Sequence, residues 1–299
     1  MANGVIEIPY SPRKQFRDFH ARNERWACLV AHRRAGKTVA AINDLIRAAI
    51  TCKSPMPLFG YVAPYRTQAK SVAWDYLKHF ARPITKSSNE GDLIIELLNG
   101  AKIRLFGADN ADAMRGLGFD GLYLDEYGDF KPSVWGNVIR PALSDKQGWC
   151  VFGGTPKGKN QFWNIYETSK KLPNEWFSLS LPASKSKLLP ESELQAAQAQ
   201  LAEDQYLQEY ECSFEAAIIG AIWGTEMRKV SEDGRITKVE NQLEVKTHTA
   251  WDLGHTDDTA IWWYQVIAGE IHIVDFFALS GGTIEEFVTK IKEKPYNYG

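Results

Sequence analysis

The sequence lacks long hydrophobic runs and has few cysteines. None of its 299 residues falls in an apolar stretch of the roughly 18 residues that a membrane-spanning helix needs, so we expect no membrane partner. Its first residues, MANGVIEIPYSPRK, have no apolar signal-peptide core, and export is therefore not expected. The four cysteines (Cys28, Cys52, Cys150 and Cys212) show no CxxC or Cys/His spacing, which favours reduced thiols in a cytoplasmic protein over a zinc site.

The chain also lacks a strong net charge, but its charges are unevenly distributed. The formal net charge is −2, while residues 1–82 hold fourteen Lys and Arg against five Asp and Glu, a net of +9. The remainder therefore carries −11. A basic region suits a polyanion such as a nucleotide or DNA, although a solvated basic surface would have the same composition.

Apolar runs of strand length alternate with helical patterns in the first 182 residues. The strand-like runs are 26–31, 58–64, 93–108, 121–126 and 148–154, and the helical patterns are 38–50 and 66–80. The run at 93–108 divides at Asn99-Gly100, which is a strong hairpin-turn signal. This alternation predicts an α/β fold in which helices flank a mostly parallel sheet.

The composition changes after Pro182. Residues 183–245 are polar and helical, and we interpret them as a linker or lid subdomain that follows a core at 1–182. Three strand-like runs (247–253, 259–267 and 270–277) and a helical pattern at 283–294 then predict the beginning of a second domain at 246–299.

The segment AHRRAGKT (31–38) resembles a phosphate-binding loop. That motif is Gly, any four residues, then Gly-Lys-Ser/Thr, and here Ala31 replaces the first Gly. The segment lies between a strand-like run and a helical pattern, as such a loop requires. Lys37 would span the β- and γ-phosphates of ATP, and Thr38 would hold Mg²⁺. The residues expected around the phosphates are His32, Arg33, Arg34, Ala35, Gly36, Lys37 and Thr38.

A phosphate loop predicts a partner strand that ends in an acidic residue. GLYLDE (121–126) supplies it, with Asp125 at the strand end and Glu126 directly after it. We expect Asp125 to organise the Mg²⁺ shell and Glu126 to act as the general base on the attacking water. The sequence therefore predicts an ATPase.

Five ordered segments extend the resemblance to the large terminase subunit of tailed bacteriophages, the motor that packages DNA into procapsids. They are YSPRKQ, HRRAGKT, MRGLGFDGLYLDE, GGTPKGKNQFW and AWDLGHTDDTAIW. The resemblance implies a P-loop ATPase of the additional-strand, catalytic-glutamate type, followed by an RNase H-like nuclease domain that cuts concatemeric DNA. It also implies a five-membered ring around double-stranded DNA, in the cytoplasm of the infected host, with the small terminase subunit and the portal protein as partners.

The resemblance also implies roles for individual residues. Gln15 would contact the adenine edge, and Thr155 would link hydrolysis to movement of the parts that grip DNA. A transition-state arginine is expected as well, either Arg33 within its own subunit or Arg115 entering a neighbouring one. A salt bridge to a nearby aspartate is the alternative role for Arg115.

In the nuclease domain, Asp252 is the expected first ligand of a Mg²⁺ or Mn²⁺ pair, and Asp258 would assist. Asp257 lies in the same turn. The other carboxylates that the family needs lie on later elements, so we expect this chain, which stops at KPYNYG, not to cut DNA.

Three other functions remain open. A helicase-like DNA translocase would share the ATPase fold, but the segment AWDLGHTDDTAIW argues against it. A nucleotide-binding scaffold would not need Glu126, and a stand-alone nuclease would not need a phosphate loop.

Overall fold

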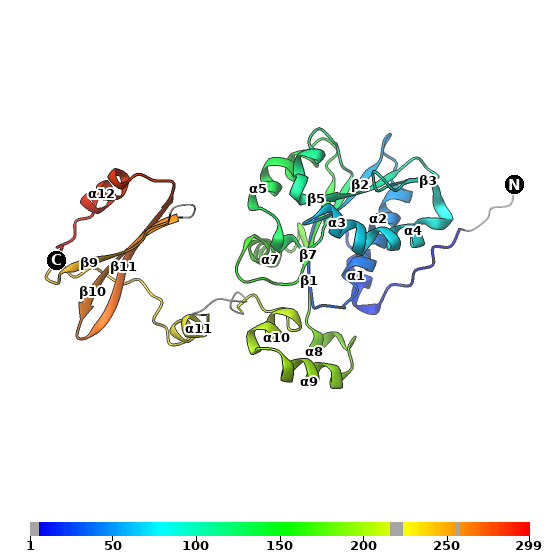
Figure 1. Cartoon of the computed structure of the whole chain (residues 1–299). Helices are drawn as coiled ribbons and strands as arrows, with labels where there is room; N and C mark the ends of the chain where they lie inside the picture. The colour runs from blue at the N-terminus through cyan, green and yellow to red at the C-terminus, as the bar shows by residue number, and fades with distance from the viewer. Residues whose placement is uncertain (1–5, 216–223, 255–257) are drawn as a thin grey trace. The chain divides into compact units, whose positions relative to one another are not determined.

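The computed structural model describes residues 6–215, 224–254 and 258–299, which belong to two compact units, Met1–Gly224 and Thr225–Gly299 (Figure 1). The boundary between the two units lies at Gly224. The predicted division into domains at residues 182 and 245 stays a prediction. No helix in these described ranges is long and apolar enough to cross a membrane.

The first unit is built on an eight-stranded sheet of order β3-β4-β5-β2-β6-β7-β1-β8. The pairs from β5 to β8 are parallel, and only β3 with β4 and β4 with β5 are antiparallel, so the predicted mostly parallel sheet is confirmed. The strands are β1 (Trp26–Ala31), β2 (Leu58–Ala63), β3 (Thr85–Asn89), β4 (Ile94–Leu97), β5 (Lys102–Gly107), β6 (Gly121–Leu124), β7 (Trp149–Gly154) and β8 (Trp176–Leu181).

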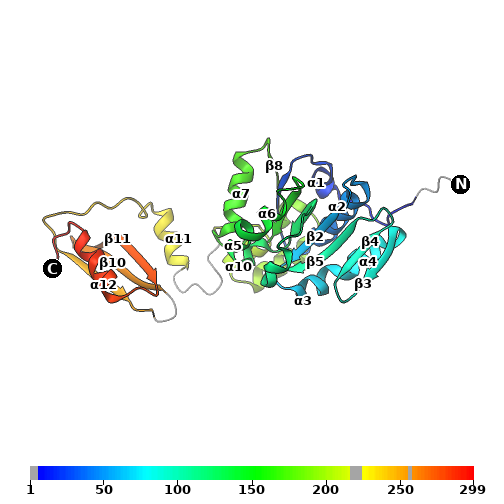
Figure 2. The same cartoon turned by 90° about the horizontal axis from the view of Figure 1, so that it is seen from above.

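Helices cover both faces of this sheet (Figure 2). Alternate residues of the buried strands point to opposite faces, so Leu29 packs towards α2 and α4 while Val30 packs towards α5 and α7. The helices are α1 (Arg17–Ala21), α2 (Lys37–Thr51), α3 (Arg66–Ala69), α4 (Asp75–Ala81), α5 (Pro132–Val134), α6 (Arg140–Ala142), α7 (Gln161–Lys171), α8 (Ala183–Ser186), α9 (Glu191–Gln200) and α10 (Glu203–Glu209).

Most of the predicted elements are confirmed. The strands at 26–31 and 58–63 and the helix at 37–51 lie within one residue of their expected bounds, and β4 and β5 form the predicted hairpin, with Gly100 at φ +84°. The helix expected at 66–80 is present, and it consists of α3 and α4 joined by a π-helical turn at Lys70–Trp74. The strand expected at 121–126 ends at Leu124, because the backbone of Glu126 turns into the left-handed region.

Sequence patterns missed β8 and α7. The β8 strand lies parallel to β1 at the edge of the sheet, and α7 packs against β1 and β8. Because β8 is only partly buried, its apolar pattern is weaker than that of the inner strands.

The second unit is a three-stranded antiparallel sheet of order β11-β10-β9 with a helix against one face. All three strands and the helix were predicted. Ile261 and Trp263 of the sheet form a small core with Phe287 of the helix, whose first turn is stabilised by a Thr283–Glu286 capping box. Its elements are α11 (Gly224–Glu232), β9 (Thr247–Asp252), β10 (Asp258–Ile267), β11 (Glu270–Ser280) and α12 (Ile284–Glu293).

Candidate functional site

The predicted phosphate loop lies at the carboxyl edge of the parallel sheet, between the end of β1 and the start of α2. Gly36 precedes α2 with φ +101°, a conformation that a side chain would strain, and Arg34 is also left-handed at φ +64°. Ala31 is the last residue of β1 and does not have a positive φ. Alanine can therefore replace glycine at this position without backbone strain.

Lys37 directs a buried ammonium group into the loop. Its Nζ donates hydrogen bonds to the carbonyl oxygens of Ala31 (2.7 Å) and His32 (3.3 Å). It also donates to the hydroxyl of Thr155, at 3.2 Å, which lies just beyond the end of β7. The three donors of the ammonium group are thus directed at the loop and at Thr155, which hold the side chain beside the start of α2.

Asp125 follows β6 and is almost completely buried. Its Oδ2 accepts a 2.5 Å hydrogen bond from the hydroxyl of Tyr61. Burial, with the nearby charge of Glu126, raises the pKa of Asp125 to about 6. Its Oδ1 is buried and has no hydrogen-bond partner among the described residues.

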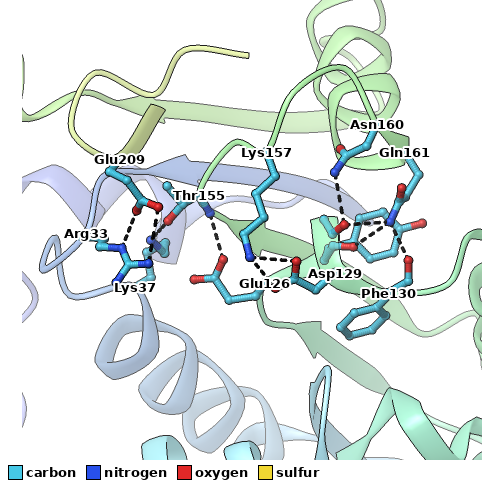
Figure 3. A network of polar contacts seen from close by, with 12 residues as sticks. Arg33, Lys37, Glu126, Asp129, Phe130, Thr155, Lys157, Asn160, Gln161 and Glu209 are labelled. Atoms are coloured by element: carbon cyan, nitrogen blue, oxygen red, sulfur yellow. Dashed lines mark hydrogen bonds and ion pairs between the residues drawn. The ribbon is translucent and has the colours of Figure 1, made fainter. Parts of the chain in front are cut away.

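Glu126 adopts a left-handed backbone conformation, with φ 47° and ψ 49°. This turn redirects the chain from the buried strand towards the loop. The Oε2 atom accepts a hydrogen bond from the backbone N–H of Thr155 at 3.2 Å. Thr155 therefore contacts both Lys37, through its hydroxyl, and Glu126, through its backbone (Figure 3).

Lys37, Glu126 and Thr155 line one cavity of about 550 Å³, whereas the buried Asp125 is not part of its lining. The lining of the cavity is strongly polar. The full lining is Arg13, Arg33, Arg34, Ala35, Gly36, Lys37, Thr38, Val39, Gln68, Tyr76, Glu126, Asp129, Thr155, Lys157 and Glu209. A cavity of this volume, rich in cations and situated at a helix N-terminus, suits a nucleotide polyphosphate.

An ion pair joins the loop to the helical segment that follows β8. The Arg33 guanidinium makes a two-pronged contact with the Glu209 carboxylate at the end of α10, and the Arg33 backbone N–H donates to the Glu209 carbonyl at 3.1 Å. The Glu209 side chain is 9% exposed and that of Arg33 is 66% exposed. The hydrogen bond that Arg33 donates to the Glu209 carboxylate raises the pKa of Arg33. Nothing near Glu209 in the sequence pointed to this contact.

His32 and Gln15 contact α8 instead of lining the cavity. The His32 Nε2 lies 2.9 Å from the Ser186 hydroxyl, and the Gln15 amide donates to the Ser186 carbonyl at 2.7 Å. Burial lowers the pKa of His32. Arg13, two residues before Gln15, does line the cavity, with a guanidinium that donates to the Ala35 carbonyl at 2.8 Å. The predicted adenine contact of Gln15 stays a prediction.

Arg115 does not line this cavity. It contacts Asp112 at 2.5 Å and lines two separate cavities of about 260 and 200 Å³ with Asn137 and Val138. The salt bridge that was the alternative role for Arg115 is therefore present. Its expected action in a neighbouring subunit stays a prediction.

The predicted nuclease residues lie in the second unit. Asp252 ends β9 opposite Ala260, and Asp258 begins β10. Both are exposed, and Asp257 lies outside the described residues. Across the described ranges, no three His, Cys, Asp or Glu residues come together as a metal site. Asp275 of β11 pairs with Lys294, at 2.5 Å, and accepts a hydrogen bond from the Tyr296 hydroxyl.

Several cavity residues were not predicted. Lys157 and Asp129 form an ion pair at 2.6 Å beside Glu126, and both lie in or next to segments that the sequence had singled out. Tyr61, which holds Asp125, is an unremarkable aromatic residue of β2 in the sequence. Its role depends on the pairing of β2 with β6, which only the fold supplies.

Known proteins resemble this chain in sequence and in fold. The family model described as "Terminase large subunit, T4likevirus-type, N-terminal" matches residues 28–230. The large terminase subunit of Escherichia phage T5 is 26% identical over 212 residues, 67% of this chain and 47% of that protein. The large terminase subunit of Thermus phage G20c is 41% identical over 59 residues, 20% of this chain and 12% of that protein. The chain thus matches less than half of the length of either relative.

Solved structures share the fold. The large terminase ATPase domain of Thermus phage P74-26 gives a TM-score of 0.61 at 20% identity, covering 69% of this chain and 95% of that domain. The large terminase of a thermophilic bacteriophage, in complex with ATP-γ-S, gives 0.54 at 16% identity, covering 94% of this chain and 70% of that protein. Since the family match covers most of the chain and includes both the loop and the acidic strand, this chain belongs to the large terminase subunit family of the T4-like type.

Proposed function

We propose that the first unit binds and hydrolyses ATP in the cavity beside the loop at 31–38. The observation that carries the proposal is the chain of contacts from Lys37 through Thr155 to Glu126, which brings a phosphate-binding cation and a candidate base to one cavity. The large terminase whose structure is described as a complex with ATP-γ-S supports the choice of nucleotide.

The residues also fit Mg²⁺. The hydroxyl of Thr38, which lines the cavity, and the Oδ1 of Asp125, which has no hydrogen-bond partner among the described residues, are oxygen donors of the kind that Mg²⁺ prefers. When bound, the ion neutralises charge on the β- and γ-phosphates.

The roles of the protein groups follow from their positions. Lys37 holds the phosphates, and Glu126 accepts the proton from the attacking water. Arg33 has the reach and charge to contact the γ-phosphate if it leaves Glu209. Thr155 senses both phosphate binding at Lys37 and proton transfer at Glu126, because its hydroxyl contacts Lys37 and its backbone N–H contacts Glu126.

The sheet order supports the additional-strand, catalytic-glutamate type of ATPase. The β7 strand lies between β1, which carries the phosphate loop, and β6, which carries the acidic pair. Thr155 can therefore contact both partners from the strand between them.

We further propose that hydrolysis drives double-stranded DNA into a procapsid. Membership of the family and the net charge of +9 on residues 1–82 support DNA as the partner. A homo-oligomeric ring, the small terminase subunit and the portal protein are proposed on the same family basis, with the host cytoplasm as the location. The second unit is proposed as the start of an RNase H-like nuclease domain, in which Asp252 and Asp258 would bind Mg²⁺ or Mn²⁺.

The proposal is tested by measuring steady-state ATP hydrolysis with and without linear double-stranded DNA. We expect Mg²⁺-dependent turnover that DNA stimulates, and loss of turnover in Lys37→Ala. Lys53→Ala serves as the matched control, because Lys53 is exposed and does not line the cavity. Turnover that survives in Lys37→Ala would assign the activity to another site. Turnover that DNA leaves unchanged would count against translocation.

A further inference from the structure

Glu126 occupies a turn whose shape requires support. The left-handed region is unfavourable for a residue with a side chain, so this conformation persists only where neighbouring contacts determine it. The residues after Glu126 form a single 3₁₀ turn, Tyr127–Asp129, which is too short to hold itself rigidly.

One side chain contacts this turn three times. The two hydrogens of the Gln161 amide Nε2 are shared among the carbonyl oxygens of Tyr127 (3.2 Å), Gly128 (3.2 Å) and Phe130 (2.7 Å), as Figure 3 shows. The three carbonyls point towards the same amide, so the curvature of the turn and the position of Gln161 determine each other.

The neighbouring Asn160 strengthens this contact. Its Nδ2 donates to the Gly128 carbonyl at 3.1 Å, while its Oδ1 caps α7 by accepting from the backbone N–H groups of Phe162 and Trp163. The Phe162 side chain is fully buried and lies edge-on to the ring of Tyr127. The start of α7 is therefore fixed to the core on one side and to the turn on the other.

The same two segments also meet beside the cavity. Lys157, four residues before Gln161, pairs with Asp129 of the turn, and Thr155 donates its backbone N–H to Glu126. The segment from 155 to 161 thus contacts both the Glu126 carboxylate and the turn that follows Glu126. A shift of α7 would move the turn, and with it the candidate base.

We propose that Gln161, assisted by Asn160, is a positioning residue for Glu126: its amide holds the turn in the shape that directs the Glu126 carboxylate into the cavity. This inference rests on the proposed ATPase function. It predicts that loss of the amide lowers the rate of hydrolysis and leaves ATP binding intact, because Gln161 does not line the cavity.

The test uses Gln161→Met, which keeps the length of the side chain and removes its donors. Single-turnover hydrolysis of radiolabelled ATP is measured with enzyme in excess, together with the ATP dissociation constant. We expect at least a tenfold loss of rate with a dissociation constant within threefold of wild type. Gln195→Met, an exposed glutamine of α9, is the matched control and should match wild type in both quantities.

The decisive comparison places the same change in a Glu126→Gln background. If Gln161 acts through Glu126, Gln161→Met should cause no further loss of rate there. An equal loss in both backgrounds would identify Gln161 as a general structural brace and overturn the proposal, as would a wild-type rate for Gln161→Met alone.

A second variant covers the case in which Gln161→Met does not fold. Asn160→Asp keeps the Oδ1 cap of α7 and removes the donor to the Gly128 carbonyl, so it should fold and show a smaller loss with the same dependence on Glu126. A loss that is independent of Glu126, or no loss, overturns the proposal. Wild-type protein that does not hydrolyse ATP, or Glu126→Gln with normal turnover, would instead reject the proposed function itself.

Discussion

The ion pair between Arg33 and Glu209 predicts that replacing either residue lowers stability by a different amount and changes nucleotide affinity in the opposite direction. Arg33→Ala leaves the Glu209 carboxylate, 9% exposed, without its cation, whereas Glu209→Gln leaves an Arg33 side chain that is 66% exposed. Breaking a fully buried pair costs about 3–5 kcal/mol, and an exposed pair contributes less than about 1 kcal/mol. In this pair the Glu209 side chain is buried and the Arg33 side chain is exposed, so we expect the cost of breaking it to lie between these two values. We therefore expect Arg33→Ala to lower the unfolding free energy of the first unit by about 2 kcal/mol and Glu209→Gln by less than about 1 kcal/mol.

The two changes should affect nucleotide binding in opposite directions. Glu209→Gln removes a negative charge from the lining of the cavity and releases Arg33, so we expect ATP-γ-S to bind several-fold tighter. Arg33→Ala should weaken binding by about tenfold, which corresponds to about 1.4 kcal/mol. The loss of stability in the double variant should be smaller than the sum of the two single losses, because the two residues contact each other.

Isothermal titration with ATP-γ-S and urea unfolding at pH 7 measure both quantities. Urea unfolding should be followed through aromatic residues of the first unit, since two units need not unfold together. Weaker nucleotide binding in Glu209→Gln would refute the reasoning, because it would make Glu209 a contributor to the nucleotide site. Strict additivity of the two stability changes would show that the pair does not form.

Three further predictions concern other parts of the chain. If Arg115 acts in a neighbouring subunit, mixing Arg115→Ala with Glu126→Gln protein should restore part of the ATPase activity that each lacks, and no rescue in a demonstrated mixed ring would contradict this. Plasmid DNA incubated with this chain and Mn²⁺ or Mg²⁺ should stay intact; cleavage that disappears in Asp252→Ala would overturn that expectation. Although burial alone would raise it, contacts with His20 and Arg22 hold the pKa of Asp44 at about 2, below its usual 3.8. The contribution of the Asp44 carboxylate to the unfolding free energy is therefore complete above about pH 4 and is lost as the pH falls towards 2. Asp44→Asn should lower the unfolding free energy at pH 7 by on the order of 3 kcal/mol, because it leaves the buried Arg22 guanidinium without its carboxylate partner. An unchanged urea midpoint would contradict this.

The sequence predicted the central strands of the sheet, but it did not predict the edge strand β8. Strands β1 and β6 are continuous apolar runs because both of their faces are covered, and such runs are easy to recognise. The edge strand Trp176–Leu181 was missed although its letters alternate, since half-burial weakens the apolar signal. Helix α7 was missed because its start coincides with the segment GGTPKGKNQFW, which was interpreted through its resemblance alone.

The site was predictable where a motif carries its own local geometry. Gly36, Lys37 and Asp125 lie where a strand, a loop and a helix must place them, and these positions follow from the chain itself. Glu209 contacts Arg33 across 176 residues, and no local pattern encodes such a contact. The hydrogen bonds from Gln161 to the turn after Glu126 likewise depend on the packing of α7, which is a tertiary contact that no local sequence pattern predicts.

The central claim is that one cavity binds ATP through Lys37 and hydrolyses it through Glu126. The most direct measurement compares ATP binding and turnover in wild type, Lys37→Ala and Glu126→Gln. We predict that Glu126→Gln keeps ATP bound and hydrolyses it at least about 10²-fold more slowly, because only the base is lost, whereas Lys37→Ala loses affinity and turnover together. Near-normal turnover in Glu126→Gln would contradict the account.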